Sequence, residues 1–302
     1  MSAMLAGGRT WVGKAPAKIN LWLEVIRKRE DGYHDISSLM LPISVYDHIE
    51  IEGRPGDGPI TIDCASPKIP DEPVIPSDER NLAWRAAELY MKASGIKAGI
   101  HIDLKKDIPS GAGLGGGSSD AAGVLAGLNT LFENAVSFAD LERLAAGLGA
   151  DVPFFLHRRA ALATGIGENL QPVDIVPGSP LLLIKPPVSV PTGWVYRNLK
   201  LTKGSPQIKL VCSGHGPWQL TDLVDRIQND LESVTVPRYP VISEIKDYLI
   251  ARGALAACMS GSGSTVFGIF ETEQAAKEAA IFAEKDWPPV FWVRAAVVTN
   301  SS

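Results

Sequence analysis

The sequence predicts an α+β protein with two domains. At 302 residues, the chain is longer than a single compact core usually supports. Residues 15–52 are patterned as strands, helical patterns follow, and the last third contains a strand–helix–strand series. That series resembles half of an α/β sandwich. We therefore expect one domain over residues 1–170 and a second over residues 171–302.

The composition narrows the class of protein. With 45% hydrophobic and 21% charged residues, the chain can bury a sizeable core. Its net charge of −5 argues against a nucleic-acid partner. No segment has the features of a signal peptide or the length of a membrane span, so we expect a cytoplasmic protein without a membrane partner. Three widely spaced cysteines predict reduced thiols and no cysteine metal site.

The segments before residue 109 are predicted from their apolar patterns. Residues 15–52 contain two alternating stretches joined by a polar turn at residues 28–34. Residues 53–78 hold many prolines and are expected to be mostly loop. A helix follows from about residue 78, and residues 100–105 alternate as a strand.

The later segments are predicted from helical spacing and helix end signals. Apolar residues recur over residues 121–131, which places Ser118 and Ser119 at a helix start, where hydroxyl groups cap free N–H groups. A second helix is expected from Ser137 to Gly149, with Asp151 just beyond. Further strands and helices are expected at residues 181–185 (strand), 241–252 (helix), 266–270 (strand), 272–285 (helix) and 290–298 (strand).

The strongest functional signal is the stretch from Pro109 to Ser119, which we call the glycine loop. Its eleven residues include five of the 29 glycines of the chain and three serines. A loop with so few side chains lets backbone N–H groups approach a bound anion, and the start of a helix offers further free N–H groups. The glycine loop therefore predicts a polyphosphate site.

Two common phosphate-binding motifs fit the glycine loop poorly. Gly111-x-Gly113-x-x-Gly116 matches the dinucleotide fingerprint, but it follows at least 100 residues of mainly strand and loop, and no acidic residue ends the next strand. The Gly-Lys-Ser/Thr ending of a P-loop is absent from the sequence. A glycine-rich helix entry without any ligand is the remaining alternative.

The glycine loop with Asp120 and Ala121 resembles the phosphate loop of the GHMP kinases, which include galactokinase, homoserine kinase and mevalonate kinase. Ala15 to Leu21 resembles the N-terminal motif of that superfamily, and Met259 to Phe267 resembles its third, glycine-rich motif. The three motifs occur in the expected order and span nearly the whole chain. The third motif has Ser-Gly-Ser-Gly where Thr is also common, and residues 200–220 match nothing in the superfamily pattern.

Within the superfamily, four strings resemble those of the branch that phosphorylates the 2-hydroxyl of a cytidine-diphosphate sugar alcohol in the non-mevalonate route to isoprenoid precursors. They are Lys18-Ile-Asn-Leu-x-Leu23, Asp31-Gly-Tyr-His34, the triple glycine before Ser118-Ser119 and Gly149-Ala-Asp-Val-Pro-Phe154. The resemblance implies a two-domain GHMP kinase fold, with a ribosomal protein S5 domain 2-like N-terminal domain and a ferredoxin-like C-terminal sandwich. It also implies ATP as co-substrate. Because no Asp-x-Asp cluster is visible, we expect Mg²⁺ to be held largely by phosphates.

The resemblance assigns roles to residues. Lys18 and Asp151 form the expected catalytic pair, with Asp151 taking the proton from the substrate hydroxyl. Tyr33 and Tyr196 are expected to stack on cytosine, His34 to hydrogen-bond its edge, and Asn20 to hold Lys18 or a substrate oxygen. The residues expected to bind ATP are Pro109, Ser110, Gly111, Ala112, Gly113, Leu114, Gly115, Gly116, Gly117, Ser118 and Ser119.

Several alternatives stay open at this point. Without the resemblance, Asp151 would be a helix cap, Lys18 a solvated strand lysine and Tyr196 a packing residue. A GHMP kinase for homoserine or mevalonate is a second candidate, but those substrates have no base to stack on Tyr33. A non-catalytic module of the S5-like fold needs a basic face, which the net acidity disfavours. The contacts to adenine stay open, with Lys105 and Lys106 the nearest cations.

Overall fold

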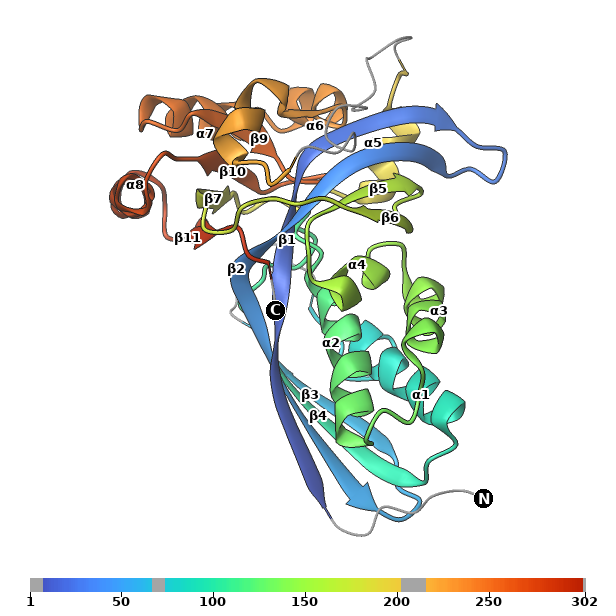
Figure 1. The fold of residues 1–302 in the computed structure, drawn as a ribbon. Coiled ribbons are helices and arrows are strands. Elements are labelled where there is room, and N and C mark those ends of the chain that lie inside the picture. Colours follow the sequence, from blue (N-terminus) through green and yellow to red (C-terminus); the bar gives the residue numbers. More distant parts are fainter. Residues whose placement is uncertain (1–7, 67–73, 202–215, 301–302) are drawn as a thin grey trace.

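The computed structural model describes residues 8–66, 74–201 and 216–300. Figure 1 shows a long, curved sheet with helices on one side, and a smaller sheet with its own helices packed at one end of it. This is the α+β arrangement that the sequence predicts. Within the described residues, no helix is both long and apolar enough to cross a membrane.

The larger sheet is built on two long strands. β1 (Arg9–Lys28) and β2 (His34–Pro55) pair antiparallel along their whole length and are joined by the turn at Gly32. β4 (Ala98–Lys105) pairs antiparallel with β2, and β3 (Ile60–Ala65) pairs parallel with β4. β3 is a strand that was not predicted within residues 53–78, which were expected to be mostly loop. This strand has only six residues, and its backbone hydrogen bonds are made with β4, which is distant in sequence.

Three short strands complete the larger sheet. β5 (Ala161–Gly165) pairs with β2, and β6 (Asn169–Pro172) pairs with β5. β8 (Gln228–Asn229) comes from the last third of the chain and pairs parallel with β1. The described strands thus form a seven-stranded sheet whose main order is β3-β4-β2-β1-β8. The division at residue 170 stays a prediction.

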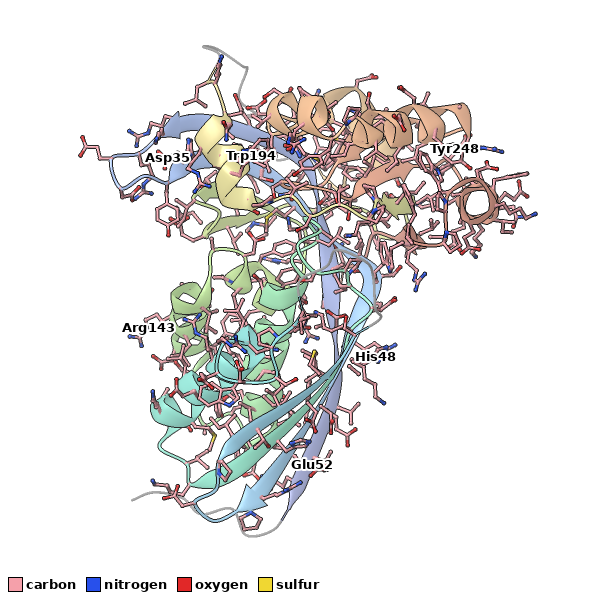
Figure 2. All side chains as sticks on the ribbon, turned by 180° about the vertical axis from the view of Figure 1, so that it is seen from behind. Asp35, His48, Glu52, Arg143, Trp194 and Tyr248 are labelled. Atoms are coloured by element: carbon pink, nitrogen blue, oxygen red, sulfur yellow. The ribbon has the colours of Figure 1, made fainter. Side chains whose placement is uncertain are left out.

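Four helices cover one face of this sheet: α1 (Leu82–Ser94), α2 (Gly116–Leu131), α3 (Phe138–Leu148) and α4 (Val152–His157). The strand pattern fixes which face they cover. On β2, Ile49 and Ile51 are buried against the helices, whereas His48 and Glu52 lie on the open face (Figure 2).

The start of α2 corrects the predicted cap. The helix begins at Gly116, its N-cap is Gly115, and no side chain caps it within the described chain. Ser118 and Ser119 therefore lie in the first turn rather than before it. Serine is a common cap, but a backbone of three successive glycines can enter the helix earlier than the apolar pattern indicates.

The smaller sheet is antiparallel, in the order β11-β7-β10-β9. Its strands are β7 (Pro180–Lys185), β9 (Ala256–Met259), β10 (Val266–Ile269) and β11 (Trp292–Val297). α7 (Val241–Ala251) packs on β9 and β10, and α8 (Glu273–Asp286) packs on β7 and β11. The remaining helices are α5 (Thr192–Asn198), the 3₁₀ helix η1 (Leu220–Arg226) and α6 (Glu232–Arg238).

Both faces of β7 are buried, which explains its uninterrupted apolar run. Leu182 and Ile184 belong to the core beneath α7 and α8. Leu181 and Leu183 belong to a second core that also contains Ile19 of β1. This second core joins the two sheets, because it packs β1 against the smaller sheet.

We predict that packing between α2 and the sheet leaves no room for a side chain at Gly123. A Cβ atom there would lie 2.6 Å from Ile49 Cδ1. Gly123→Leu should lower the free energy of unfolding by roughly 1–3 kcal/mol, because overpacking strains neighbouring side chains. Denaturant unfolding followed by circular dichroism measures the change.

The matched control is Gly147→Leu in α3, where a Cβ atom would meet nothing within 4 Å. There the better helix propensity of leucine should stabilise the protein by up to about 1 kcal/mol. Equal effects of the two substitutions would contradict the close packing of α2.

Candidate active site

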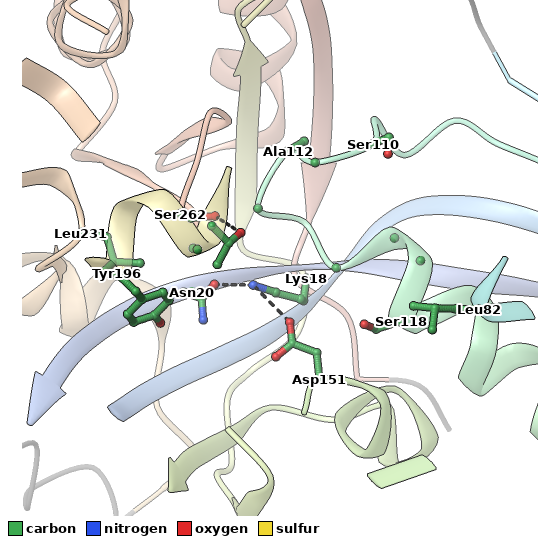
Figure 3. A pocket seen from close by; sticks show the side chains of 18 of the residues that line it. Lys18, Asn20, Leu82, Ser110, Ala112, Ser118, Asp151, Tyr196, Leu231 and Ser262 are labelled. Carbon is green, nitrogen blue, oxygen red and sulfur yellow. Dashed lines mark hydrogen bonds and ion pairs between the residues drawn. The ribbon is translucent and has the colours of Figure 1, made fainter. Parts of the chain in front are cut away.

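A cavity of about 900 Å³ lies between the glycine loop, β1, the turn at Asp151 and α5 (Figure 3). Cavities of this size lie at the upper end of the range for small-molecule sites. Both halves of the chain line it, because Gly261 and Ser262 reach it from the loop between β9 and β10. We call residues 260–265 the serine-glycine loop.

Most of the glycine loop lines this cavity. Pro109 to Gly113 and Gly115 to Ser118 are lining residues, and α2 begins at Gly116, so its first N–H groups lie at the cavity wall. Leu114 and Ser119 are buried and do not line the cavity. The backbone oxygen of Leu114 accepts a hydrogen bond of 3.0 Å from the backbone N–H of Lys18.

The two loops meet at a point where only glycine fits. A Cβ atom at Gly113, which has a φ of +78°, would lie 2.0 Å from the backbone oxygen of Ser260. Ser260 Oγ donates a hydrogen bond of 2.9 Å to the Gly113 oxygen and accepts one of 3.2 Å from the backbone N–H of Asn20. One buried hydroxyl therefore joins the glycine loop, β1 and the serine-glycine loop.

Lys18 lies at the centre of the cavity wall, although its side chain is only 5% exposed. Its ammonium group donates a hydrogen bond to Asn20 Oδ1 and lies 3.9 Å from Asp151 Oδ2 (Figure 3). Burial lowers the pKa of Lys18, and the charge of Asp151 opposes that shift. Lys18 is therefore not a solvated strand lysine.

Asp151 is held at the cavity by the turn before α4. It occupies the N-cap position of that short helix, yet its side chain makes no capping hydrogen bond within the described chain. With 35% of the side chain exposed, the carboxylate is open to the cavity. The arrangement does not fit a purely capping role.

Asn20 is oriented by a chain of hydrogen bonds on β1 and β2. Its Nδ2 donates to Ser38 Oγ over 2.7 Å, and the Ser38 hydroxyl donates to the Trp22 oxygen over 2.7 Å. Because Nδ2 is engaged in this way, Oδ1 points at the Lys18 ammonium group. The sequence left open whether Asn20 contacts Lys18, and the structure places it there.

The opposite end of the cavity is aromatic. Tyr33, His34 and Tyr196 all line it, and the rings of His34 and Tyr196 lie 5.2 Å apart. Tyr33 is 61% exposed and contacts no other aromatic ring among the described residues. Burial, together with the nearby charge of Lys28, lowers the pKa of His34, and burial with the charge of Asp151 raises that of Tyr196 to about 12. Near pH 7 we therefore expect both groups to be uncharged.

A side-chain contact connects this aromatic end to the serine-glycine loop. The hydroxyl groups of Thr192, at the start of α5, and Ser262 lie 2.8 Å apart, and both residues line the cavity (Figure 3). Because α5 also contains Tyr196, the loop and the aromatic wall are joined directly. Neither Thr192 nor Ser262 was singled out from the sequence.

A buried ionic group at the ends of the glycine loop was also missed. Lys106 forms ion pairs with Asp47 of β2 and Asp120 of α2, and all three side chains are nearly inaccessible. Burial acts to lower the pKa of Lys106, but the charges of Asp120 and Asp47 outweigh it and raise that pKa. Lys106 and Asp120 line the cavity, whereas Lys105 is exposed and does not. The alternating strand pattern marked Asp47 only as one polar position among several.

Two family models match the chain. The model for the GHMP kinases N terminal domain matches residues 81–159, which include the glycine loop and Asp151. The model for the GHMP kinases C terminal domain matches residues 219–288, which include the serine-glycine loop. The two-domain GHMP kinase fold is thereby confirmed.

Solved structures show the same fold. A crystal structure of 4-(cytidine 5'-diphospho)-2C-methyl-D-erythritol kinase superimposes with a TM-score of 0.76 at 36% identity, over 95% of this chain and 99% of that one. A homoserine kinase from Cytophaga hutchinsonii gives a TM-score of 0.70 at 21% identity, over 96% of this chain and 95% of the other. The second likeness shows the fold alone.

Curated relatives identify the family of this chain more narrowly than the shared fold does. The 4-diphosphocytidyl-2-C-methyl-D-erythritol kinase of Geobacter sulfurreducens is 48% identical over 88% of this chain and 92% of the relative. The enzyme of that name from Acetivibrio thermocellus is 42% identical over 87% of this chain and 91% of the relative. Identity at this level over most of both chains shows that this chain belongs to the 4-diphosphocytidyl-2-C-methyl-D-erythritol kinase family of the GHMP kinases.

Proposed function

We propose that this chain transfers the γ-phosphate of ATP to the 2-hydroxyl of 4-diphosphocytidyl-2-C-methyl-D-erythritol, a step in isoprenoid precursor biosynthesis. The observation that supports this most is the place of the Lys18–Asp151 pair. It lies in one cavity between a glycine loop suited to phosphates and an aromatic end suited to a base. The names of the relatives at 42–48% identity point to the same reaction.

ATP binds with its phosphates along the glycine loop. The free N–H groups at the start of α2 and the positive end of its dipole favour negative charge at this point. Loop residues that line the cavity bring their backbones close to the ligand, because they contribute little side chain. Leu114 instead acts through its backbone, which holds Lys18.

Mg²⁺ accompanies ATP in this proposal. It prefers oxygen ligands and keeps several waters, so it needs few protein groups. The hydroxyl of Ser118 is an oxygen ligand on the cavity wall, and it fits such a partly hydrated ion. When bound, the metal neutralises charge on the phosphate oxygens.

Asp151 is the base in the transfer. The oxygen of the 2-hydroxyl forms a bond to the γ-phosphorus, the bond from phosphorus to the β-phosphate oxygen breaks, and ADP leaves. An alcohol is a far weaker acid than a carboxylic acid, so the carboxylate cannot ionise the hydroxyl beforehand. It accepts the proton late, as the new bond to phosphorus forms, which a loose transition state permits.

Lys18 stabilises the charge on the transferred phosphoryl group and orients Asp151. Its ammonium group is fixed by Asn20 and lies near Asp151, so little reorganisation is needed during the reaction. Burial lowers the pKa of Lys18, against the opposing charge of Asp151, so its positive charge is lost at a lower pH than that of an ordinary lysine. The reaction should therefore fail on the alkaline side.

The cytosine of the acceptor binds at the aromatic end. Neutral His34 has one ring nitrogen that donates and one that accepts, which suits the edge of a cytosine. Tyr33 and Tyr196 offer flat apolar faces for stacking. This end of the cavity distinguishes a nucleotide-bearing acceptor from homoserine or mevalonate.

The proposed activity is tested by measuring ADP release with Mg·ATP and one of three acceptors: 4-diphosphocytidyl-2-C-methyl-D-erythritol, homoserine or mevalonate. We expect turnover with the first acceptor only. Turnover with homoserine or mevalonate alone would replace the proposed substrate, and release with none of them would refute a kinase of this class.

We predict that Asp151→Asn abolishes most turnover while ATP binding stays near normal. An amide cannot accept the proton, and loss of a general base typically costs roughly 10²–10⁴-fold in kcat. ADP release gives the rate, and titration calorimetry gives the affinity for ATP. The control is Asp57→Asn, which removes a carboxylate that pairs with Lys97 outside the cavity. Near-normal turnover by Asp151→Asn would exclude the assigned role.

We predict that Tyr33→Ala chiefly raises the KM for the cytidine-bearing acceptor. A stacked base contributes roughly 1–3 kcal/mol, which corresponds to a rise of about 5- to 150-fold. Steady-state kinetics with each substrate varied in turn separates the two KM values. Tyr46→Ala, outside the cavity, is the control. A change confined to the KM for ATP would contradict stacking by Tyr33.

A further inference from the structure

Asn229 is a buried amide outside the cavity whose polar atoms are all engaged. Its Nδ2 donates hydrogen bonds to the backbone oxygens of Met259, over 2.8 Å, and Gly261, over 2.7 Å. Its Oδ1 accepts a hydrogen bond of 3.0 Å from the backbone N–H of Leu231. Only an uncharged side chain with two donors and an acceptor satisfies all three partners.

The residues that follow Asn229 reinforce the same region. Asp230 Oδ2 accepts a hydrogen bond of 2.8 Å from the backbone N–H of Val25 on β1. Glu232 Oε1 accepts one of 2.8 Å from the backbone N–H of Met259, and Glu232 Oε2 pairs with Lys246 over 2.5 Å. The segment 229–232 thus binds both β1 and the start of the serine-glycine loop.

The serine-glycine loop in turn touches the residues around Lys18. A Cβ atom at Gly261 would lie 3.3 Å from Asn20 Oδ1 and 3.2 Å from the Gly113 oxygen, so the Gly261 backbone already packs against both. Asn20 Oδ1 is the atom that accepts the hydrogen bond from Lys18. The serine-glycine loop thus lies against the partner of Lys18, and its Ser260 Oγ also accepts the hydrogen bond of 3.2 Å from the backbone N–H of Asn20.

We propose that Asn229 is a positioning residue for the phosphoryl transfer. It holds the Gly261 carbonyl, Gly261 confines Asn20, and Asn20 sets the place of Lys18 beside Asp151. Asn229 does not line the cavity, so it acts through these residues rather than by touching a substrate. The kinetic consequence rests on the proposed function, but the effect on Asn20 does not.

The test is Asn229→Asp, which keeps the shape of the side chain but replaces two donors by a carboxylate oxygen that repels both carbonyls. We expect kcat to fall by roughly 100-fold, as for a small misplacement of reacting groups, while both KM values stay close to those of the wild type. The matched control is Asn300→Asp, because Asn300 also donates to a carbonyl, that of Ile175 over 2.8 Å, but outside the cavity.

A second readout does not depend on turnover. In a nitrogen-15 spectrum, the side-chain amide signal of Asn20 should shift in Asn229→Asp and stay in place in Asn300→Asp. Asn229→Ser keeps one donor and should lose less of kcat. If circular dichroism shows that Asn229→Asp does not fold, the positioning role is tested with Asn229→Ser, through kcat and the Asn20 signal.

The possible outcomes distinguish a failure of the positioning role of Asn229 from a failure of the proposed kinase function. If the folded variants keep the wild-type kcat and the Asn20 signal does not move, the positioning role is refuted. A rise confined to KM would also overturn it, because the role predicts an effect on kcat. If the wild type releases no ADP with the cytidine-bearing acceptor, the proposed function fails, and the Asn20 signal still decides the role of Asn229.

Discussion

The contact between Gly113 and Ser260 is the constraint on which the rest of the site depends. Two loops from different parts of the chain meet here with no side chain between their backbones. The Ser260 hydroxyl bonds the glycine loop and β1 at once, and the backbone N–H of Thr265 donates to the Ala112 oxygen over 3.2 Å. The backbone N–H groups of the glycine loop are therefore fixed relative to Lys18 before any ligand binds, which is the preorganisation that electrostatic catalysis requires.

Two buried ammonium groups line the same cavity, and their surroundings give them different tasks. Lys106 is held between two buried carboxylates, which raise its pKa and keep it charged. Asp47 also accepts hydrogen bonds from the N–H groups of Asp107 and Ile108, and Asp120 lies just beyond the glycine loop, so this group fixes both ends of the loop. Lys18 has a single, partly exposed carboxylate at 3.9 Å, and Asp151 therefore stays accessible to a substrate.

The features that could be predicted from the sequence are those that depend on local patterns or on contiguous motifs. Alternation located the strand at residues 100–105, and glycine density located the glycine loop. The resemblance supplied Lys18 and Asp151, which physical reasoning alone would have set aside as a solvated lysine and a cap. β3 was missed because its hydrogen bonds come from β4. The ion pair between Lys106 and Asp47 was not predicted because the two residues lie 59 positions apart in sequence. Contacts between distant segments leave no periodic signal.

The fold alone does not determine the acceptor, because a homoserine kinase shares it at 21% identity. Discrimination must come from side chains added to the shared frame. In the proposed function these side chains are Tyr33 and His34, at the turn between β1 and β2, and Tyr196 on α5. The Thr192–Ser262 contact joins α5 to the serine-glycine loop, whose other contacts hold the glycine loop and Asn20. The side chains proposed to recognise the acceptor and the backbone groups proposed to bind the phosphates are thus joined through the serine-glycine loop, which sets the distance between them.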